Sequence, residues 1–357
     1  MSARTSLAAG TGLVVGAVLI TLLAVELGCR LIRGPETLLH WTNWVQDERL
    51  KMARQNLGGR FVYEPTVGYV HSPGYTTGLL HYDERGFRVM PPLPEGADDA
   101  PPVLATGASF TLGDEVADDE SWPARLQGLL RRRTVNAGVA AYAMDQIVLR
   151  TEQLAATLKP ALLVVGFTAD NLRHAEMSRT WGVPKPYFEF EGGRLVLRNV
   201  PVPRAPDPRS TLDVWQHALG WSVALDMLMT MKGWRYEWVI DHQRVLARGA
   251  GERLACPLMQ RLAGLRIPTL VVAQYDFYVW VDAEFGAEQH RTSQVVLGCA
   301  EQAGLAALDT YDAVEKAVHA DGRSSIYGAW HPNAAGYRLI AEQIAAELRR
   351  RGIYPPP

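Results

Sequence analysis

Two short segments of the chain carry residue types that suit acyl transfer. In the first, Ser109 lies in the sequence GASFTLGD directly after an apolar segment. A serine just beyond a strand end can present its hydroxyl and its own backbone N–H to a substrate carbonyl, so one turn supplies a nucleophile and half of an oxyanion hole. A serine in such a turn also caps the following helix. Taken alone, the segment favours the capping interpretation.

The second segment is WHPNAAGY, which contains His331. Pro332 suits the first position of a helix, and the apolar periodicity that follows continues to the cations and glycine at 349–352, which are typical of a helix end. His331 is therefore predicted on a rigid corner, where an imidazole is a suitable general base for a serine hydroxyl. An isolated histidine in this position is more often a surface or capping residue.

The elements that must position these residues alternate between short apolar segments and amphipathic helices. Helices are predicted at 121–132 and 143–158, and buried strands at 103–106, 135–136, 161–166, 269–273 and 306–308. This alternation predicts a three-layer α/β/α domain with a parallel sheet of about five strands covered on both faces. Ligands of such sheets bind at the carboxyl ends of the strands, so a site is expected there.

The N-terminus predicts one membrane-spanning helix. Residues 7–25 are uncharged and mostly apolar, and at ~1.5 Å per residue they nearly match a hydrocarbon layer of ~30 Å. The apolar segment meets Glu26 without a small-x-small cleavage pattern, so residues 1–27 are predicted to be retained as an anchor. Glu26 also argues against lipidation of Cys29.

The sequence predicts three regions, and the anchor is the first of them. Residues 28–100 are interpreted as a juxtamembrane helix, an extended arm and a Pro/Gly-rich linker at 91–102, and residues 101–352 as the α/β domain. A hairpin is predicted around Gly192-Gly193. A helical insertion is predicted at about 205–250, and its large aromatics favour packing over sugar stacking; they are Trp215, Trp221, Trp234 and Trp238.

Composition excludes some classes of protein. With 36 basic and 38 acidic side chains the formal charge is −2, so nucleic acid is not an expected partner. The nine histidines lack metal-ligand spacing, and no metal or cofactor is implied. The three cysteines are too few for a disulfide scaffold, and Cys256 and Cys299 could form one bridge or remain two buried thiols.

Residues 61–350 resemble the SGNH/GDSL hydrolase family, and specifically its membrane-anchored extracytoplasmic branch. The resemblance is carried by GASFTLGDEV at 107–116, NAGVAAYAMDQ at 136–146, GFTADN at 166–171 and HPNAAGYRLIAE at 331–342. It implies that Ser109 is the nucleophile, that Gly138 lends a backbone N–H to the oxyanion hole and that His331 is the base. It also implies an inner-membrane protein whose C-terminal domain is periplasmic.

Departures from the family pattern fall on functional positions. Ala108 replaces the aspartate of Gly-Asp-Ser, and the family's Asn-Asp pair is reversed as Asp170-Asn171. A carboxylate at the oxyanion position would repel developing negative charge, so Asn171 could serve only if its loop shifts by one residue. Gly328 and Ala329 stand where the family carries the acid that orients the histidine. A backbone carbonyl or Asp321 could hold the imidazole instead.

The function expected from these observations is that of a membrane-tethered serine acyl hydrolase or O-acyltransferase acting on acetylated cell-surface glycan. The alternative is a catalytically degenerate fold that serves as a binding or scaffold subunit of a membrane complex. In that case the anchor would contact a membrane-protein partner, and its Gly12-x-x-x-Gly16 spacing allows close helix approach. A third possibility is a carbohydrate-binding module that uses the Trp-rich insertion without turnover.

Overall fold

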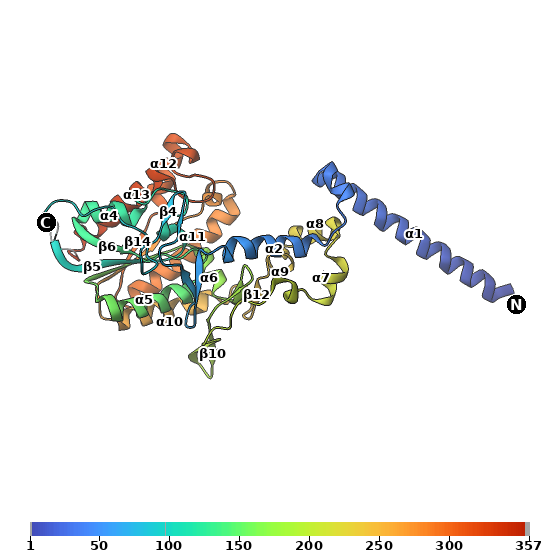
Figure 1. Ribbon diagram of the computed structural model, residues 1–357, viewed down its shortest axis with the longest axis horizontal. Helices are drawn as coiled ribbons and strands as arrows, with labels where there is room; N and C mark the ends of the chain where they lie inside the picture. The colour runs from blue at the N-terminus through green and yellow to red at the C-terminus, as the bar shows by residue number, and fades with distance from the viewer. Residues whose placement is uncertain (1, 97, 354–357) are drawn as a thin grey trace. The chain divides into compact units, whose positions relative to one another are not determined.

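The computed structural model describes residues 2–96 and 98–353 (Figure 1). The chain forms two compact units. Unit 1 consists of the residues up to Asn56 together with 205–243, and unit 2 consists of 57–204 together with the residues from 244 onward. Residues 205–243 of the insertion predicted at about 205–250 are therefore part of the same unit as the N-terminal helices, whereas 244–250 belong to unit 2.

Unit 2 is built on a five-stranded parallel sheet. Its strand order is β14-β13-β7-β5-β6. The strands are β5 (Asp98–Thr106), β6 (Arg132–Asn136), β7 (Leu162–Phe167), β13 (Thr269–Ala273) and β14 (Ala306–Asp309). Every residue of β7 and β13 is buried, which explains why both read as continuous apolar segments. The predicted parallel sheet of about five strands is confirmed.

Helices cover both faces of this sheet. Successive β7 residues alternate between two cores, since Val165 joins the core beneath α5 (Met144–Leu158), α10 (Glu252–Gly264) and α11 (Ala283–Gln302), whereas Val164 joins the core beneath α4 (Trp122–Leu130) and α13 (Ala334–Arg350). The three-layer α/β/α class is therefore confirmed. The other helices of this unit are α3 (Ser109–Leu112), α6 (Ala169–His174), α12 (Tyr311–Asp321), η3 (Phe277–Trp280) and η4 (Arg323–Ser325).

The predicted arm belongs to unit 2. Tyr69 and Phe87 are buried in its larger core, and Arg88 forms an isolated bridge with Asn136 of β6. Because β5 begins at Asp98, the linker predicted at 91–102 extends into a strand of the sheet. The remaining short strands are β1 (Phe61–Glu64), β2 (Gly68–His71), β3 (Thr76–Thr77), β4 (Leu80–His81), β8 (Met177–Thr180), β9 (Val183–Pro184), β10 (Tyr187–Glu191), β11 (Arg194–Arg198) and β12 (Gln243–Arg244). The β10–β11 pair is the hairpin predicted around Gly192-Gly193.

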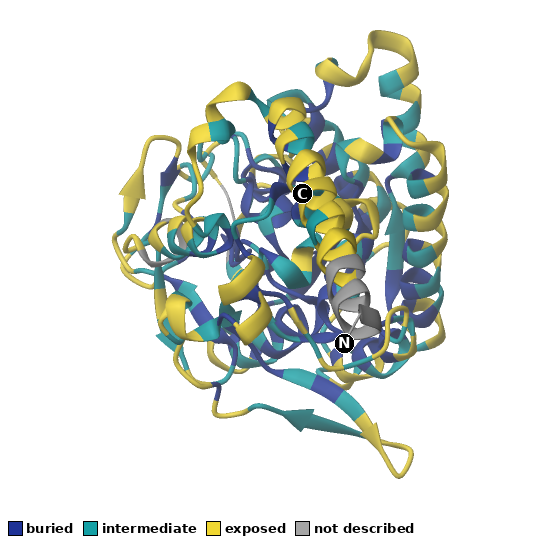
Figure 2. Ribbon diagram, turned by 90° about the vertical axis from the view of Figure 1, so that its right-hand side faces the viewer, coloured by how far each residue is buried: buried dark blue, intermediate teal, exposed yellow. Residues whose placement is uncertain are grey.

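Unit 1 is helical. Its elements are α1 (Ser2–Arg33), η1 (Pro35–Leu39), α2 (Trp44–Leu57), η2 (Pro208–Thr211), α7 (Val214–Leu219), α8 (Val223–Met231) and α9 (Arg235–Trp238). Among the described residues, one helix is long and apolar enough to cross a membrane, with a candidate span of Thr11–Arg33 and a mean hydropathy of 2.3. Figure 2 shows that the described side chains of this helix are exposed over most of its length.

Two tryptophans of the insertion do not pack as predicted. Trp221 and Trp238 are half-buried, but Trp215 is 65% exposed and Trp234 is 53% exposed. The packing prediction is wrong for these two residues. Trp215 is exposed because α7 buries Gln216 instead of its aromatic residue, and Trp234 is the exposed N-cap of α9.

Cys256 of α10 and Cys299 of α11 form a disulfide bond. Of the two alternatives, one bridge or two buried thiols, the structure shows the bridge. The bond joins two helices that cover the same face of the sheet, and it closes a loop with a sequence separation of 43 residues. A crosslink stabilises a fold chiefly by restricting the unfolded chain, and the effect grows with loop length.

We expect the double variant Cys256→Ser/Cys299→Ser to lose about 2–4 kcal/mol of unfolding free energy, as is typical when a loop of this kind is opened. Urea denaturation followed by circular dichroism measures the loss. Reduction of the wild type with dithiothreitol should lower its midpoint similarly and should leave the double variant unchanged. An equal midpoint for reduced and oxidised wild type would contradict the prediction.

Candidate active site

Ser109 is the first residue of α3, three residues beyond the end of β5. The turn that brings it there needs glycine at 107, because a Cβ on Gly107 would lie 2.6 Å from the backbone oxygen of Gly166 in the neighbouring strand. As the first helical residue, Ser109 has a backbone N–H without an intrahelical acceptor. Ser109 therefore presents a hydroxyl and a backbone donor at the carboxyl edge of the sheet.

His331 lies against Ser109. The two residues are 222 positions apart in the chain, and the distance between His331 Nε2 and Ser109 Oγ is 2.9 Å. The helix that follows begins at Ala334, capped by the Asn333 side chain, which accepts hydrogen bonds from two backbone N–H groups. The predicted helix start at Pro332 is therefore wrong by two residues, because the asparagine cap and not the proline sets it.

Glu115 supplies the carboxylate that the sequence analysis did not find. Its Oε1 lies 3.0 Å from His331 Nδ1. Its Oε2 accepts hydrogen bonds from the backbone N–H groups of Ala329, at 2.9 Å, and Trp330, at 3.1 Å. The carboxylate is thus bound by the same loop that carries the histidine. The expectation that a backbone carbonyl or Asp321 holds the imidazole is wrong.

Position 328, where the family carries the acid that orients the histidine, is a glycine that lies beside the Glu115 carboxylate. A Cβ at position 328 would lie 2.8 Å from Glu115 Oε2, so the Glu115 carboxylate occupies the space beside this glycine. An acidic side chain at position 328 would compete with Glu115 for that space. The carboxylate therefore comes from the loop six residues after Ser109 and not from the loop before His331.

The hydrogen bonds around Glu115 hold it ionised. Burial by itself would raise the pKa of Glu115, but the hydrogen bonds from the His331 ring and from the Trp330 N–H lower the pKa below its ordinary value of 4.5. Asp276 is affected differently, because burial and the charge of Asp170 raise its pKa while His331 lowers it. Glu115 is therefore the carboxylate that can stabilise an imidazolium at position 331.

This lowered pKa predicts a pH-dependent contribution to stability. A carboxyl whose pKa is lower in the folded than in the unfolded chain stabilises the fold above the unfolded pKa, and the contribution disappears as the pH falls through the folded pKa. We expect the wild type to exceed Glu115→Gln in unfolding free energy at pH 7, and the difference to shrink below pH 4.5. Urea titrations at both pH values measure it. A difference that grows toward acid would contradict the prediction.

The two oxyanion donors predicted besides Ser109 are engaged elsewhere. The Gly138 N–H donates to the Asn136 side chain at 3.1 Å, and glycine is needed there because a Cβ would lie 2.4 Å from Leu112 N. The Asn171 amide donates to the Tyr142 carbonyl at 2.9 Å, while its oxygen caps α6. The one-residue shift that would bring Asn171 into an oxyanion hole is therefore not observed.

Asp170 and Ala141 lie in the two segments that carry these engaged donors. Asp170, whose charge the sequence analysis placed at an oxyanion position, is paired with Arg173 at 2.6 Å. Ala141 has a left-handed φ of 64°, an uncommon conformation for a residue with a Cβ. The hydrogen bonds of the described residues give the Ala141 N–H no acceptor. This N–H follows β6 in the loop that contacts the Ser109 turn through the Val139 N–H and Gly107 carbonyl, 3.0 Å apart.

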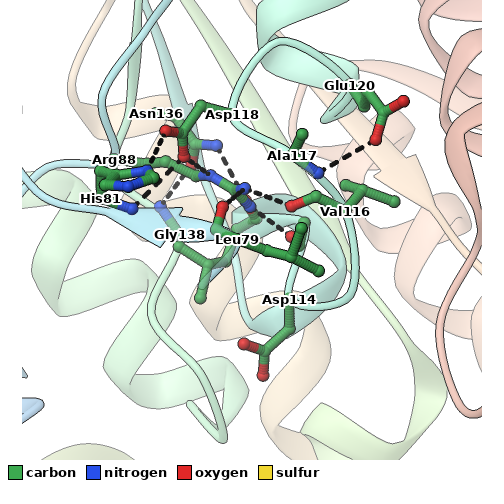
Figure 3. Close-up of polar contacts among 12 residues, drawn as sticks. Leu79, His81, Arg88, Asp114, Val116, Ala117, Asp118, Glu120, Asn136 and Gly138 are labelled. Atoms are coloured by element: carbon green, nitrogen blue, oxygen red, sulfur yellow. Dashed lines mark hydrogen bonds and ion pairs between the residues drawn. The ribbon is translucent and has the colours of Figure 1, made fainter. Parts of the chain in front are cut away.

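Arg88 holds the loop that carries Glu115 (Figure 3). Arg88 is 2% exposed, and its guanidinium forms an ion pair with Asp118, with 3.0 Å between Nε and Oδ1. Asp118 in turn contacts His81 Nδ1 at 2.6 Å. The guanidinium donates to four backbone carbonyls, those of Leu79, Leu112, Gly113 and Val116. Three of these carbonyls flank Glu115 in sequence, so Arg88 fixes the conformation that brings Glu115 to His331.

We expect Arg88→Met to lower the unfolding free energy by about 3 kcal/mol or more, because several buried carbonyls and Asp118 lose their partner together. Folded Arg88→Met should also lose the reactivity of Ser109 toward a fluorophosphonate probe, because the Glu115 loop is no longer held. Arg85→Met is the matched control, since Arg85 is an exposed arginine of the same arm. Equal stability and reactivity of the two variants would contradict the assignment.

Fold and site together define an α/β domain in which a serine, a histidine and a glutamate form a hydrogen-bonded chain in the order used by serine hydrolases. No family model matches the chain, and no curated protein matches it. Among the described residues, no group of three or more His, Cys, Asp or Glu side chains could hold a metal ion.

Several solved structures are similar to this chain. LAE5, an α/β hydrolase from the metagenome of Lake Arreo, Spain, has 16% identity and a TM-score of 0.44, covering 70% of this chain and 94% of its own. Axe2, an acetylxylan esterase from Geobacillus stearothermophilus, has 14% identity and a TM-score of 0.43 over the same shares, 70% and 94%. A protein of the G-D-S-L family from Desulfitobacterium hafniense has 12% identity and a TM-score of 0.36 over 70% and 99%.

Proposed function

We propose that the protein is a serine acyl hydrolase or O-acyltransferase. The observation that supports the proposal is the continuous hydrogen-bonded chain from Ser109 Oγ through both nitrogens of His331 to Glu115. Such a chain lets the imidazole accept a proton at Nε2 while the carboxylate stabilises the charge that develops on the ring. A serine that merely capped a helix would not need a histidine and a carboxylate from distant parts of the chain.

The reaction proceeds in two steps. Ser109 Oγ attacks the ester carbonyl as its proton passes to His331 Nε2, and collapse of the tetrahedral intermediate breaks the ester C–O bond while Nε2 returns the proton to the leaving alcohol. Water or a sugar hydroxyl then attacks the acyl-Ser109 and gives its proton to Nε2. As the acyl C–Oγ bond breaks, Nε2 returns this proton to Ser109 Oγ, and a free acid or a new ester leaves. The N–H groups of Ser109 and Ala141 are the proposed oxyanion donors.

The proposed substrate is an acetyl ester of a cell-surface glycan. Trp330, the neighbour of His331 in the chain, is 56% exposed. Its ring centroid lies 5.9 Å from that of Tyr278, which is 42% exposed, and 5.7 Å from that of Phe277. Exposed aromatic faces beside a reactive serine suit the apolar face of a sugar ring, whose hydroxyls stay in water.

The proposed location is the inner membrane, with α1 as the single span and unit 2 in the periplasm. The length and hydropathy of α1 support the span. The Cys256–Cys299 disulfide supports the side of the membrane, because disulfides persist in oxidising compartments and are rare in the cytosol. An alkaline phosphatase fusion at the C-terminus tests this orientation and should be active only if unit 2 is exported.

A fluorophosphonate probe tests the proposed activity, since it reacts with activated serines. We expect the wild type to be labelled, and the label to disappear in Ser109→Ala and in His331→Ala. Ser210→Ala is the matched control, because Ser210 is an exposed serine of unit 1, and it should label like the wild type. Absence of labelling in folded wild-type protein would contradict the enzyme and favour a degenerate fold that serves as a binding or scaffold subunit.

A further inference from the structure

Two helices of unit 1 bury polar residues and expose apolar ones. In α7 the buried residue is Gln216, whereas Val214 is 72% exposed and Trp215 is 65% exposed. Helices that pack onto a water-soluble domain normally turn their apolar face inward. In α7 the polar residue is therefore buried and the apolar residues are exposed, which is the reverse of a helix on the surface of a water-soluble domain.

The next helix repeats the inversion. The sequence of α8 is VALDMLMTM, and its two buried residues are Val223 and the carboxylate Asp226. Leu228 is 48% exposed and Met231 is 82% exposed. An exposed apolar surface of this kind on a soluble domain marks a contact with a lipid or protein surface.

The end of α1 is bound to the beginning of α8. Glu26 accepts hydrogen bonds from the Ser222 hydroxyl at 2.7 Å and from the Val223 N–H at 2.9 Å, and Arg30 donates to the Trp221 carbonyl at 2.6 Å. Arg33, the last residue of α1, pairs with Asp226. The polar groups at the end of α1 and the buried carboxylate of α8 therefore neutralise one another within unit 1.

These contacts place α8 at the depth of the lipid headgroups if α1 crosses the bilayer. The uncharged segment of α1 ends just before Glu26, and the residues that bind α8 extend from there to Arg33, a rise of roughly 10 Å at 1.5 Å per residue. The interfacial layer between hydrocarbon and water has a thickness of roughly the same size. An apolar surface at this depth would contact lipid and not bulk water.

We propose that unit 1 lies in the interface of the same membrane through one apolar surface. The proposal rests on the proposed span of α1. The proposed surface consists of exposed apolar side chains of α7, α8 and the N-cap of α9, which are Val214, Trp215, Leu219, Leu228, Met231 and Trp234. Tryptophan is enriched at this level of a bilayer, where its apolar ring and its polar N–H are both satisfied. The exposed Lys232, next to Met231 in the chain, adds attraction to anionic headgroups.

Phospholipid is the occupant favoured over a protein partner because of this attachment. The start of α8 is bonded to the end of a helix that is surrounded by lipid in the proposed span, so every inserted copy of the chain would hold α8 at the same depth. The consequence is a second attachment to the membrane. The helices α7 and α8 would then be held at the membrane surface by their own contact with lipid as well as by the bonds between α8 and α1.

Spin labelling of the full chain in nanodiscs of phosphatidylcholine and phosphatidylglycerol tests the proposal. The background is Cys29→Ser, because Cys29 is the free cysteine whereas Cys256 and Cys299 are bonded to each other. Labels are placed at Met231→Cys and Trp215→Cys. A label at Val18→Cys reports on the span of α1, and one at Glu288→Cys, an exposed position of unit 2, is the reference for water. The collision rates with oxygen and with a water-soluble nickel chelate are compared.

We expect the labels at positions 231 and 215 to collide several-fold less often with the nickel chelate, and more often with oxygen, than the label at position 288. A label at position 18 that is freely accessible to the chelate would contradict the proposed span. A lipid-exposed label at position 18 with water-exposed labels at 231 and 215 would overturn the interfacial surface alone. Low collision rates with both reagents at 231 would show a protein contact, as with a second copy of the chain, and would also overturn it.

Discussion

Ser109→Ala and His331→Ala are each expected to lower kcat for an aryl acetate by about 10⁴-fold or more. The reason is the 2.9 Å contact between Ser109 Oγ and His331 Nε2, through which the nucleophile loses its proton. Without the hydroxyl no acyl-enzyme forms, and without the imidazole the hydroxyl is a weak nucleophile at neutral pH. The measurement is steady-state hydrolysis with each purified variant, after its fold has been checked by circular dichroism.

The double variant provides a sharper test of the same pair. Residues that act as one unit give losses that do not add, so Ser109→Ala/His331→Ala should be no slower than the worse single variant. Losses that multiply would show that the two side chains act independently, and the proposed proton transfer between them would be wrong. Ser210→Ala should keep the wild-type rate.

Much of the fold could be predicted because its signals are local. The strand predicted at 269–273 matches β13 residue for residue, since a strand buried on both faces is apolar at every position. Local signals place Ser109 after a strand and His331 before a helix, but their pairing across 222 residues was implied by the family resemblance and not by these signals. The start of α13 was missed because Asn333 and Pro332 are adjacent helix-start signals, and only the side-chain cap decides between them.

The rest of the site depends on long-range contacts that residue spacing does not encode. Glu115 is one of several acidic residues after Ser109, and nothing in the sequence singles it out until the 328–331 loop is folded against it. Glycine at 328 is the one weak sign, because it leaves room for a carboxylate from elsewhere. The Gly138 N–H is bonded to Asn136 at the end of β6, and the Asn171 amide is bonded to the Tyr142 carbonyl in the loop after β6. Such bonds follow from loop conformation and not from motif order.

Glu115→Gln is expected to lower kcat by about 10³–10⁴-fold, because an amide can still occupy the space but cannot stabilise the imidazolium or keep Nδ1 as the protonated nitrogen. The hydrogen bond at 3.0 Å to His331 Nδ1, and the backbone N–H groups that orient the carboxylate, carry this expectation. Hydrolysis of an aryl acetate measures it, and Asp119→Asn, an exposed carboxylate of the same loop, is the matched control.

The glycine at position 328 offers a rescue of the same site. In Glu115→Ala the space beside Gly328 is empty, so Glu115→Ala/Gly328→Asp should recover part of the lost activity by returning a carboxylate from the histidine loop. Gly328→Asp in the wild-type background should instead be harmful, because two carboxylates would compete for one set of N–H donors. Full activity of Glu115→Gln would show that His331 needs no carboxylate, and the chain would then act through a serine–histidine pair alone.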